Sequence, residues 1–228
     1  MIKNNIRLAI IDNAIDHKIY RPVEHWTEFI NLPWEAFHAK KSSFPNLQDF
    51  THIILTGSEA SILERQEWVY EEIEVVQEAV EKGLSILGSC YGHQLLALAL
   101  TGPKNVRRCE RPEMGWIPIE IDTQNTFLGR ETPAFTLTLH FDEVADLGDE
   151  FDVFARTPGC AVQAFQKKGF PIWGLQPHPE INIKNGQQLL KNLIEKNAPA
   201  SHQMEESLLM EPCDSGLIHY VTDNFFSI

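Results

Sequence analysis

A cysteine, Cys90, lies between two glycines where an apolar strand pattern gives way to an apolar helix pattern. The strand is expected over Leu84–Leu87, and the helix from about Gly92 to Thr101. The spacing G-x-C-x-G is the cysteine counterpart of the strand-turn-helix elbow in G-x-S-x-G hydrolases. A sharp turn leaves no room for neighbouring side chains, which favours glycine at Gly88 and Gly92. Helix amides pointing at the sulfur favour the thiolate, so the pattern predicts a nucleophile.

A nucleophilic cysteine needs a base and an orienting group; without them, a small buried core cysteine is the alternative. Among nine histidines, His178 stands out because it follows an apolar strand, Ile172–Leu175, where α/β sites lie. In extended backbone, residues two apart face the same side, so His178 and Glu180 project together. Pro177 and Pro179 stiffen that form. The pair predicts a base oriented by a carboxylate; the alternative is a turn histidine beside a surface glutamate.

A second loop of interest follows the apolar strand expected over Thr51–Leu55. The chain there continues into small and polar residues from Thr56 to Ser61. A loop of this kind beside an elbow can supply backbone N–H groups to an oxyanion. The alternative is an ordinary turn between a strand and a helix, which is the better interpretation if no elbow is present.

The remaining pattern is typical of an α/β domain. A further strand is expected at Arg7–Ile11 and another at Trp34–His38, and helices are expected at Pro22–Ile30, Trp68–Lys82 and Asn185–Asn197. Short β segments are expected after the elbow helix, at Val106–Arg108, Gly115–Ile121, Phe135–Leu139, Phe151–Ala155 and Cys160–Gln166. The acidic residues of the Trp68–Lys82 helix are expected on its solvated face: Glu71, Glu72, Glu74 and Glu78. Together these elements predict a three-layer α/β fold with a mostly parallel central sheet.

Composition narrows the classes of function. The 228 residues suit one α/β domain with a sizeable core, and 43% are hydrophobic. The net charge of −13 argues against a nucleic-acid or anionic-membrane partner. No apolar run approaches the roughly 20 residues that span a bilayer, and residues 1–8 lack the features of a signal peptide. The four cysteines are far apart, so we expect no disulfide framework and a reducing cytoplasm.

No metal site or cofactor is expected. Several histidines fall far from one another in the chain and are interpreted as surface or loop residues: His17, His25, His38 and His52.

Taken together, the segments Gly88–Gln94 (Gly-Ser-Cys-Tyr-Gly-His-Gln) and Gln176–Glu180 (Gln-Pro-His-Pro-Glu) resemble class I, triad-type glutamine amidotransferases. The resemblance covers roughly residues 6–194 and is strongest for the amidotransferase domain of GMP synthase and its stand-alone relatives. Ile53–Ile62 is similar to the family's oxyanion strand, and Leu139–Val144 to its Ser-His-x-Asp-x-Val segment. Glu113–Trp116 resembles its Gly-Trp turn.

This resemblance implies an amidotransferase domain over residues 1–197, with a tail over 198–228 that packs on the domain or extends it. It implies that Cys90, His178 and Glu180 hydrolyse the side-chain amide of glutamine through a γ-glutamyl thioester. It further implies oxyanion binding by the backbone amides of Gly57 and Tyr91. The residues that it implies for substrate binding are Ser58, Gln94, His140 and Phe141.

The sequence departs from the family pattern in two places. Thr56-Gly57-Ser58 replaces the usual Gly-Gly-Pro, and Leu139 stands where serine is frequent. No P-loop or adenylating motif follows, so ammonia is expected to pass to a separate synthetase subunit. One alternative is a hydrolase that acts on a γ-glutamyl peptide or conjugate with the same triad. A second is a catalytically silent regulatory protein of this fold, against which the complete triad counts.

Overall fold

A single nine-stranded sheet organises the computed structural model, which describes residues 6–227. The sheet order is β2-β1-β3-β4-β9-β8-β7-β5-β6. The strands are β1 (Leu8–Asp12), β2 (Trp34–His38), β3 (His52–Leu55), β4 (Ser85–Ser89), β5 (Val106–Ile121), β6 (Ala134–Val144), β7 (Phe151–Arg156), β8 (Ala164–Lys167) and β9 (Ile172–Leu175). The α-helices are α1 (Pro22–Thr27), α2 (Glu67–Glu81), α3 (Tyr91–Thr101), α4 (Ile183–Glu195), α5 (Ser201–Leu209) and α6 (Leu217–Phe225). Residues 1–5 of the expected domain and residue 228 of the expected tail lie outside the described residues.

One half of the sheet is parallel. Strands β2, β1, β3, β4 and β9 run in the same direction, with Ile10 opposite Ile54 and Leu87 opposite Trp173. The inner strands β1, β3 and β4 are buried along their whole length. Their short apolar runs are typical of strands that are covered on both faces of a parallel sheet. The predicted mostly parallel sheet is therefore confirmed, and its parallel half ends at β9.

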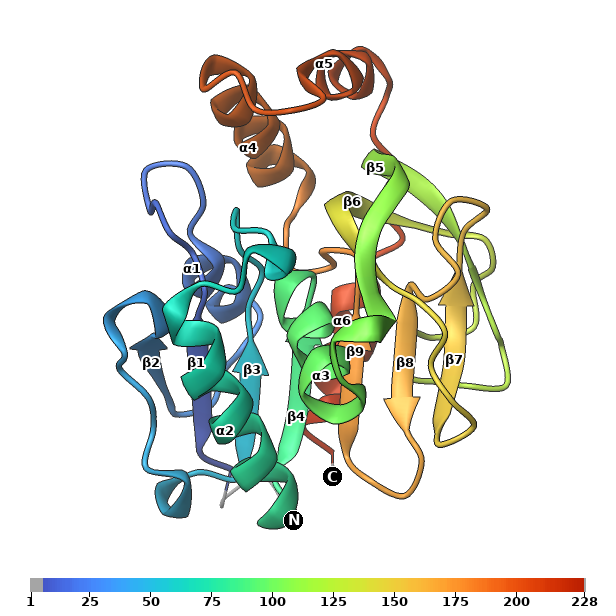
Figure 1. The fold of residues 1–228 in the computed structure, drawn as a ribbon. Helices are drawn as coiled ribbons and strands as arrows, with labels where there is room; N and C mark the ends of the chain where they lie inside the picture. The colour runs from blue at the N-terminus through green and yellow to red at the C-terminus, as the bar shows by residue number, and fades with distance from the viewer. Residues whose placement is uncertain (1–5, 228) are drawn as a thin grey trace.

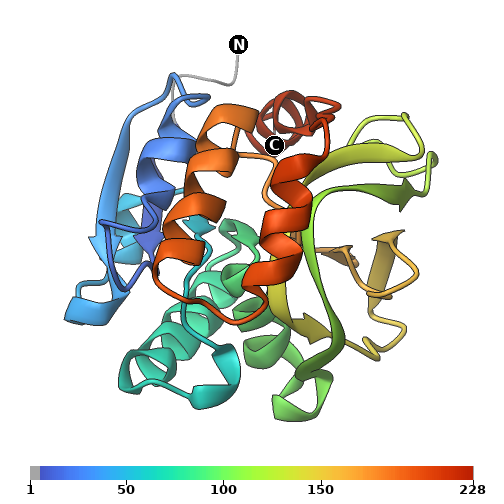
Figure 2. The same ribbon diagram turned by 90° about the horizontal axis from the view of Figure 1, so that it is seen from above.

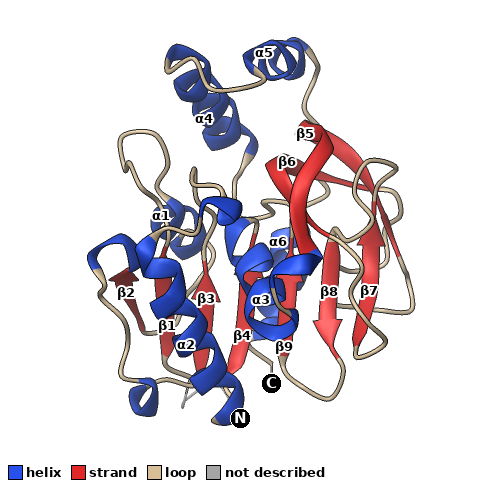
Figure 3. Cartoon of the chain, in the orientation of Figure 1, coloured by secondary structure: helices blue, strands red, loops and turns tan. Residues whose placement is uncertain are grey.

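The other half is antiparallel and curls away from this frame (Figures 1 and 3). Strands β8, β7, β5 and β6 follow β9 with alternating directions. The segments expected separately at Val106–Arg108 and Gly115–Ile121 belong to one strand, β5, whose pairing with β6 shifts register between Arg108 and Glu113. Such an irregularity bends a strand locally, which explains why the sequence pattern reads as two elements.

Helices cover both faces of the sheet, so the predicted three-layer α/β fold is confirmed (Figure 2). Helices α2 and α3 share one apolar cluster with β3 and β4. Helices α1 and α6 share a second cluster, in which Trp26 and Phe225 are fully buried. The tail thus contributes α6 to an outer layer. None of the helices within residues 6–227 combines the length and the apolar character that crossing a bilayer requires.

Helices α4 and α5 stand above the carboxyl ends of the parallel strands (Figure 1). Helix α4 begins after Asn182, whose side-chain oxygen accepts a hydrogen bond from the amide of Asn185 at 2.9 Å. Helix α5 contacts α4 and β5. Both helices therefore lie on the side of the sheet where ligands bind in parallel α/β folds.

Two surface assignments made from the sequence are wrong. Glu72 is fully buried, because the inward face of α2 consists of Val69, Glu72, Val76 and Ala79. His52 is buried as well, and its ring packs against Phe225 of α6. In both positions tertiary packing covers a polar side chain that the local pattern places at the surface.

Candidate active site

Cys90 occupies a strained turn between β4 and α3. Its backbone has φ of 49° and ψ of −103°, a conformation that a non-glycine residue rarely adopts. A side-chain carbon on Gly88 would overlap the carbonyl of Gly92, and one on Gly92 would overlap the carbonyl of Leu55. The crowding that the sequence predicts around the elbow is therefore present, and glycine is required at both flanking positions.

His178 and Glu180 form a buried pair beside this turn. Nδ1 of His178 lies 2.9 Å from Oε1 of Glu180, and Glu180 has no solvent exposure. The side chains of His178 and Cys90 line the same cavity. Burial lowers the pKa of His178, but the sulfur of Cys90 and the carboxylate of Glu180 raise it more, to about 10. The imidazolium form is therefore favoured, with a proton available beside the sulfur.

Two further side chains hold the Glu180 carboxylate. The hydroxyl of Ser89 donates to it at 3.2 Å, and the hydroxyl of Tyr20 at 3.3 Å. Burial, and after it the charge of Glu180, raise the pKa of Tyr20 well above its usual value, so its phenol stays a neutral donor. Sequence reasoning missed both residues. For Ser89 a signal existed, namely a polar residue directly before the cysteine in a buried strand.

The loop after β3 reaches the same place. A side-chain carbon on Gly57 would lie 2.9 Å from Cε1 of His178 and 2.9 Å from the hydroxyl of Tyr20. The loop is fastened to the elbow, because the amide of Gly92 donates to the carbonyl of Thr56 at 3.1 Å. The side chain of Asn13 also donates to this carbonyl, at 3.1 Å. This arrangement brings Gly57 and the elbow together, as expected from the sequence.

A cavity of about 850 Å³ opens in front of Cys90 and His178. Tyr91 and all the residues expected to bind substrate line it: Ser58, Gln94, His140 and Phe141. Gly57 is not among the lining residues of this cavity, although it adjoins His178. Strand β6 forms one wall, and the carbonyl of Leu139 accepts a hydrogen bond from the Cys90 sulfur at 3.7 Å.

The side chains of Gln94 and His140 are already engaged within the protein. The amide nitrogen of Gln94 donates to the carbonyl of Asp142 at 2.7 Å and to the side chain of Gln176 at 3.2 Å. The ring nitrogens of His140 lie 3.1 Å from the carbonyl of Asp142 and 3.1 Å from the carboxylate of Glu113. The amide nitrogen of Gln94 and both ring nitrogens of His140 are therefore already paired within the protein.

The far side of the cavity is formed by α4 and the start of the tail. Leu189 and Leu193 of α4 and Met204 of α5 give this side an apolar surface. Near the β6 wall, Arg108 extends over the cavity and its Nη1 lies 3.1 Å from the carboxylate of Asp142. The cavity thus joins a polar end at Cys90 to an apolar wall.

Comparison with known proteins identifies the class. The family model described as "Glutamine amidotransferase class-I" matches residues 9–197. The chain belongs to the class I glutamine amidotransferases, which are cysteine-dependent enzymes. A glutamine amidotransferase from Thermotoga maritima has the same fold, with a TM-score of 0.73 at 20% identity over 99% of this chain and 100% of that one.

Within this family the chain is similar to GMP synthase components. It is 34% identical, over 82% of its length and 97% of the relative, to a glutamine-hydrolysing GMP synthase subunit of Thermococcus kodakarensis. It is also 34% identical, over 62% of its own length, to the GMP synthase of Caldicellulosiruptor saccharolyticus, of which the match covers only 27%. The similarity therefore falls on a subunit in one relative and on part of a longer chain in the other.

Proposed function

We propose that Cys90, His178 and Glu180 hydrolyse the side-chain amide of L-glutamine. The observation that carries this proposal is the buried His178–Glu180 pair, with the strained Cys90 beside it at one cavity. A carboxylate on Nδ1 fixes the imidazole tautomer and leaves the other ring nitrogen for the sulfur and the substrate. The raised pKa of His178 favours an imidazolium, which can give its proton to the leaving nitrogen.

The reaction follows from this geometry in two stages. The thiolate of Cys90 attacks the amide carbon, and the negative oxygen that forms is held by the backbone amides of Gly57 and Tyr91. The amide of Tyr91 has no partner within α3 because it lies in the first turn of that helix. His178 gives its proton to the leaving nitrogen, so ammonia departs and a γ-glutamyl thioester remains. His178 then takes a proton from water, whose oxygen attacks the thioester and releases glutamate and the thiolate.

The polar end of the cavity is proposed to hold the two α-groups of glutamine. Ser58, Gln94 and the backbone of His140 and Phe141 surround it. Ammonia is proposed to pass to a separate synthetase subunit. Support for that acceptor comes from the Thermococcus relative, which is a subunit of a GMP synthase. The match covers 97% of that relative and 82% of this chain.

A second substrate class is favoured by the size of the cavity. About 850 Å³ lies near the upper end of the roughly 300–1,000 Å³ found for drug-sized ligands. Leu189, Leu193 and Met204 form an apolar wall, for which the polar ends of glutamine provide no matching group. A γ-glutamyl conjugate with an apolar leaving group would use the same triad, and its leaving group would pack against this apolar wall.

One kinetic experiment separates these candidates. Release of glutamate and ammonia from glutamine, and of the amine from γ-glutamyl-p-nitroanilide, is measured for the wild type and for Cys90→Ala. Cys213→Ala is the matched control, because that cysteine is exposed. We expect Cys90→Ala to abolish turnover and Cys213→Ala to leave it unchanged. Turnover of the anilide alone would favour the conjugate hydrolase, and an active Cys90→Ala protein would contradict both candidates.

A further inference from the structure

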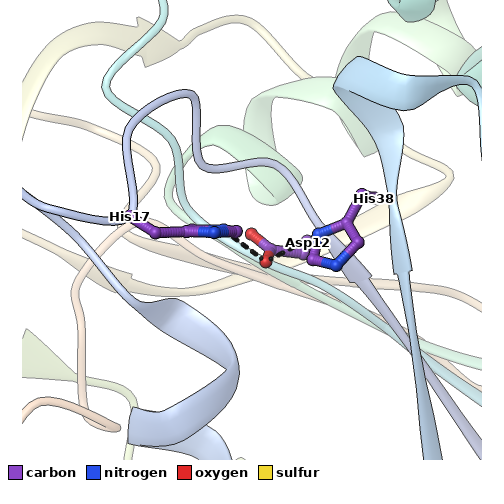
Figure 4. Close-up of side chains that lie close together, drawn as sticks. All are labelled: Asp12, His17 and His38. Atoms are coloured by element: carbon purple, nitrogen blue, oxygen red, sulfur yellow. Dashed lines mark hydrogen bonds and ion pairs between the residues drawn. The ribbon is translucent and has the colours of Figure 1, made fainter.

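Three side chains with metal-binding atoms meet at the edge of the sheet, away from the cavity. Asp12 and His38 are the last residues of β1 and β2 and are paired in register, and His17 lies in the loop after β1. Nε2 of His17 is 2.8 Å, and Nδ1 of His38 is 3.2 Å, from the same oxygen of Asp12 (Figure 4). The ligand atoms all lie within 4.8 Å of one another. His17 and His38, which are far from one another in the chain, therefore meet at one carboxylate.

The geometry points to a divalent-metal site: we propose that His17, His38 and Asp12 bind Zn²⁺ or a similar first-row ion. Two imidazole nitrogens and one carboxylate oxygen are a donor set that such ions prefer. Ligands placed about 2.0–2.2 Å from a tetrahedral ion are roughly 3.3–3.5 Å apart. The observed separations of 2.8 Å and 3.2 Å require only a small opening of the cluster.

The surroundings suit an ion with an open position. The side chain of Asp12 is only 3% exposed, and its second oxygen accepts a hydrogen bond from the amide of Ala14 at 3.0 Å. This bond fixes the carboxylate as outer-shell partners do in metal sites. The imidazole of His17, in a loop, is 46% exposed, and that of His38, on the edge strand β2, is 38% exposed. Water therefore has access to complete the coordination.

A metal at this position would act on the active site through the loop between β1 and α1. His17 lies in that loop, and Tyr20 three residues later donates to Glu180. Ile15, Ile19 and Tyr20 of the loop line the cavity, whereas Asp12, His17 and His38 do not. The ion would thus fasten a segment that positions the triad, without contacting the reacting atoms.

Zn²⁺ titration by calorimetry tests the proposal. Cys90→Ala protein is used throughout, because a thiolate beside His178 is itself a Zn²⁺ ligand. The protein is first stripped with a chelator, and Zn²⁺ is then added alone. We expect one site whose affinity falls by more than about 10-fold in His17→Ala and in His38→Ala, a loss that even outer-shell changes produce. The matched control is His202→Ala, an exposed histidine 3.5 Å from Glu206 on α5.

The outcomes separate a metal site from a hydrogen-bonded cluster. Loss of affinity in both histidine variants, with the His202→Ala affinity unchanged, supports the site. Equal affinity in the Cys90→Ala parent protein and in its His17→Ala and His38→Ala derivatives overturns it, as does an absence of binding at micromolar Zn²⁺. Replacement of Zn²⁺ by Co²⁺ provides a second measurement: intense visible bands, absent in His17→Ala, are expected for the tetrahedral ion.

Discussion

The two halves of the sheet make different contributions to the site. The parallel half carries the proposed reacting groups, because Cys90 follows β4 and His178 follows β9, which are neighbouring strands. The antiparallel half forms the enclosure, because β6 lines the cavity and its Leu137 accepts the backbone N–H of His178 at 2.8 Å. The proposed reactive side chains thus lie at the ends of adjacent parallel strands, and one wall of the cavity in front of them comes from the curled antiparallel half.

This difference suggests how the two halves separate chemistry from recognition. Changes at the parallel strand ends should alter the rate of reaction, whereas changes along β6, α4 and α5 should alter which substrate is accepted. The two helices of the tail also belong to different parts of the molecule. Helix α6 packs in the layer behind the parallel half, whereas α5 stands above the sheet and its Met204 lines the cavity. Substitutions in the triad, in α6 and in α2 test this division, with effects expected to decrease in that order.

Glu180→Gln should reduce kcat by roughly 100-fold or more, the range of a general acid–base contribution. The substitution removes the charge that raises the pKa of His178 and leaves the hydroxyls of Ser89 and Tyr20 without a carboxylate partner. KM should change little, because Glu180 does not line the cavity. Steady-state kinetics on the substrate identified above provide the measurement.

Ser89→Ala is the control for Glu180→Gln. It removes one hydrogen bond from the same carboxylate and keeps the charge, so its effect on kcat should be clearly smaller. Equal kcat for the wild type and Glu180→Gln would show that the carboxylate of Glu180 does not contribute to the rate. The chemistry could then not be assigned to the parallel half on the basis of the His178–Glu180 pair.

Phe225→Ala should lower the free energy of unfolding by about 3–5 kcal/mol, as large-to-small changes in a core do. Phe225 is fully buried, and its ring lies 6.2 Å from that of Trp173 in β9 and 5.1 Å from that of His52 in β3. The measurement is urea unfolding monitored by circular dichroism. Leu209→Ala in α5 is the matched control; this side chain is 88% exposed, so its change should stay within about 0.5 kcal/mol. Equal effects of the two substitutions would contradict the division of the tail.

Much of the parallel half could be predicted because its signals are local. Two glycines flanking Cys90, and two prolines around His178, restrict the backbone within a few residues, and short apolar runs mark the strands on either side. The paired strand ends then follow from the rule that sites of parallel sheets lie at their carboxyl edge. Local chemistry and global fold agree here.

The unpredicted features depend on contacts between distant segments. The phenol of Tyr20 reaches Glu180 across 160 positions, and no nearby residue indicates that role. The cluster at Asp12 forms only because β1 and β2 end side by side. Contacts between distant segments also set the position of α6. Its apolar residues can be seen in the sequence, but their packing behind β3 and β9 cannot.

Helix α2 shows a failure of a different kind, in the register of its buried face. The apolar positions Ile73 and Val80 suggest one register, but the fully buried face runs through Val69, Glu72, Val76 and Ala79. These are three- and four-residue steps, as a helix requires. A prediction that assigns only apolar residues to the buried face of the helix therefore misses Glu72. The consequence is a group whose ionisation should affect the stability of the fold.

Glu72→Gln should change how stability depends on pH. Burial raises the pKa of Glu72 well above its usual value, and the nearby Asn13 amide offsets only part of this effect. A raised pKa in the folded state means that the neutral carboxyl contributes stability fully below the unfolded pKa, about 4.3. This contribution is lost as pH rises toward the folded value, by up to about 1.4 kcal/mol per pH unit. The glutamine variant has no such loss.

The free energy of unfolding of Glu72→Gln, relative to that of the wild type, should therefore rise between pH 5 and pH 8. Urea unfolding at several pH values measures this difference. Glu74→Gln is the matched control, because Glu74 is exposed on the same helix and its curve should run parallel to that of the wild type. A constant difference between Glu72→Gln and the wild type across this range would show that Glu72 does not gain a proton on folding. The carboxylate would then be ionised near Tyr91, and its charge would have to be stabilised by nearby polar groups such as Asn13.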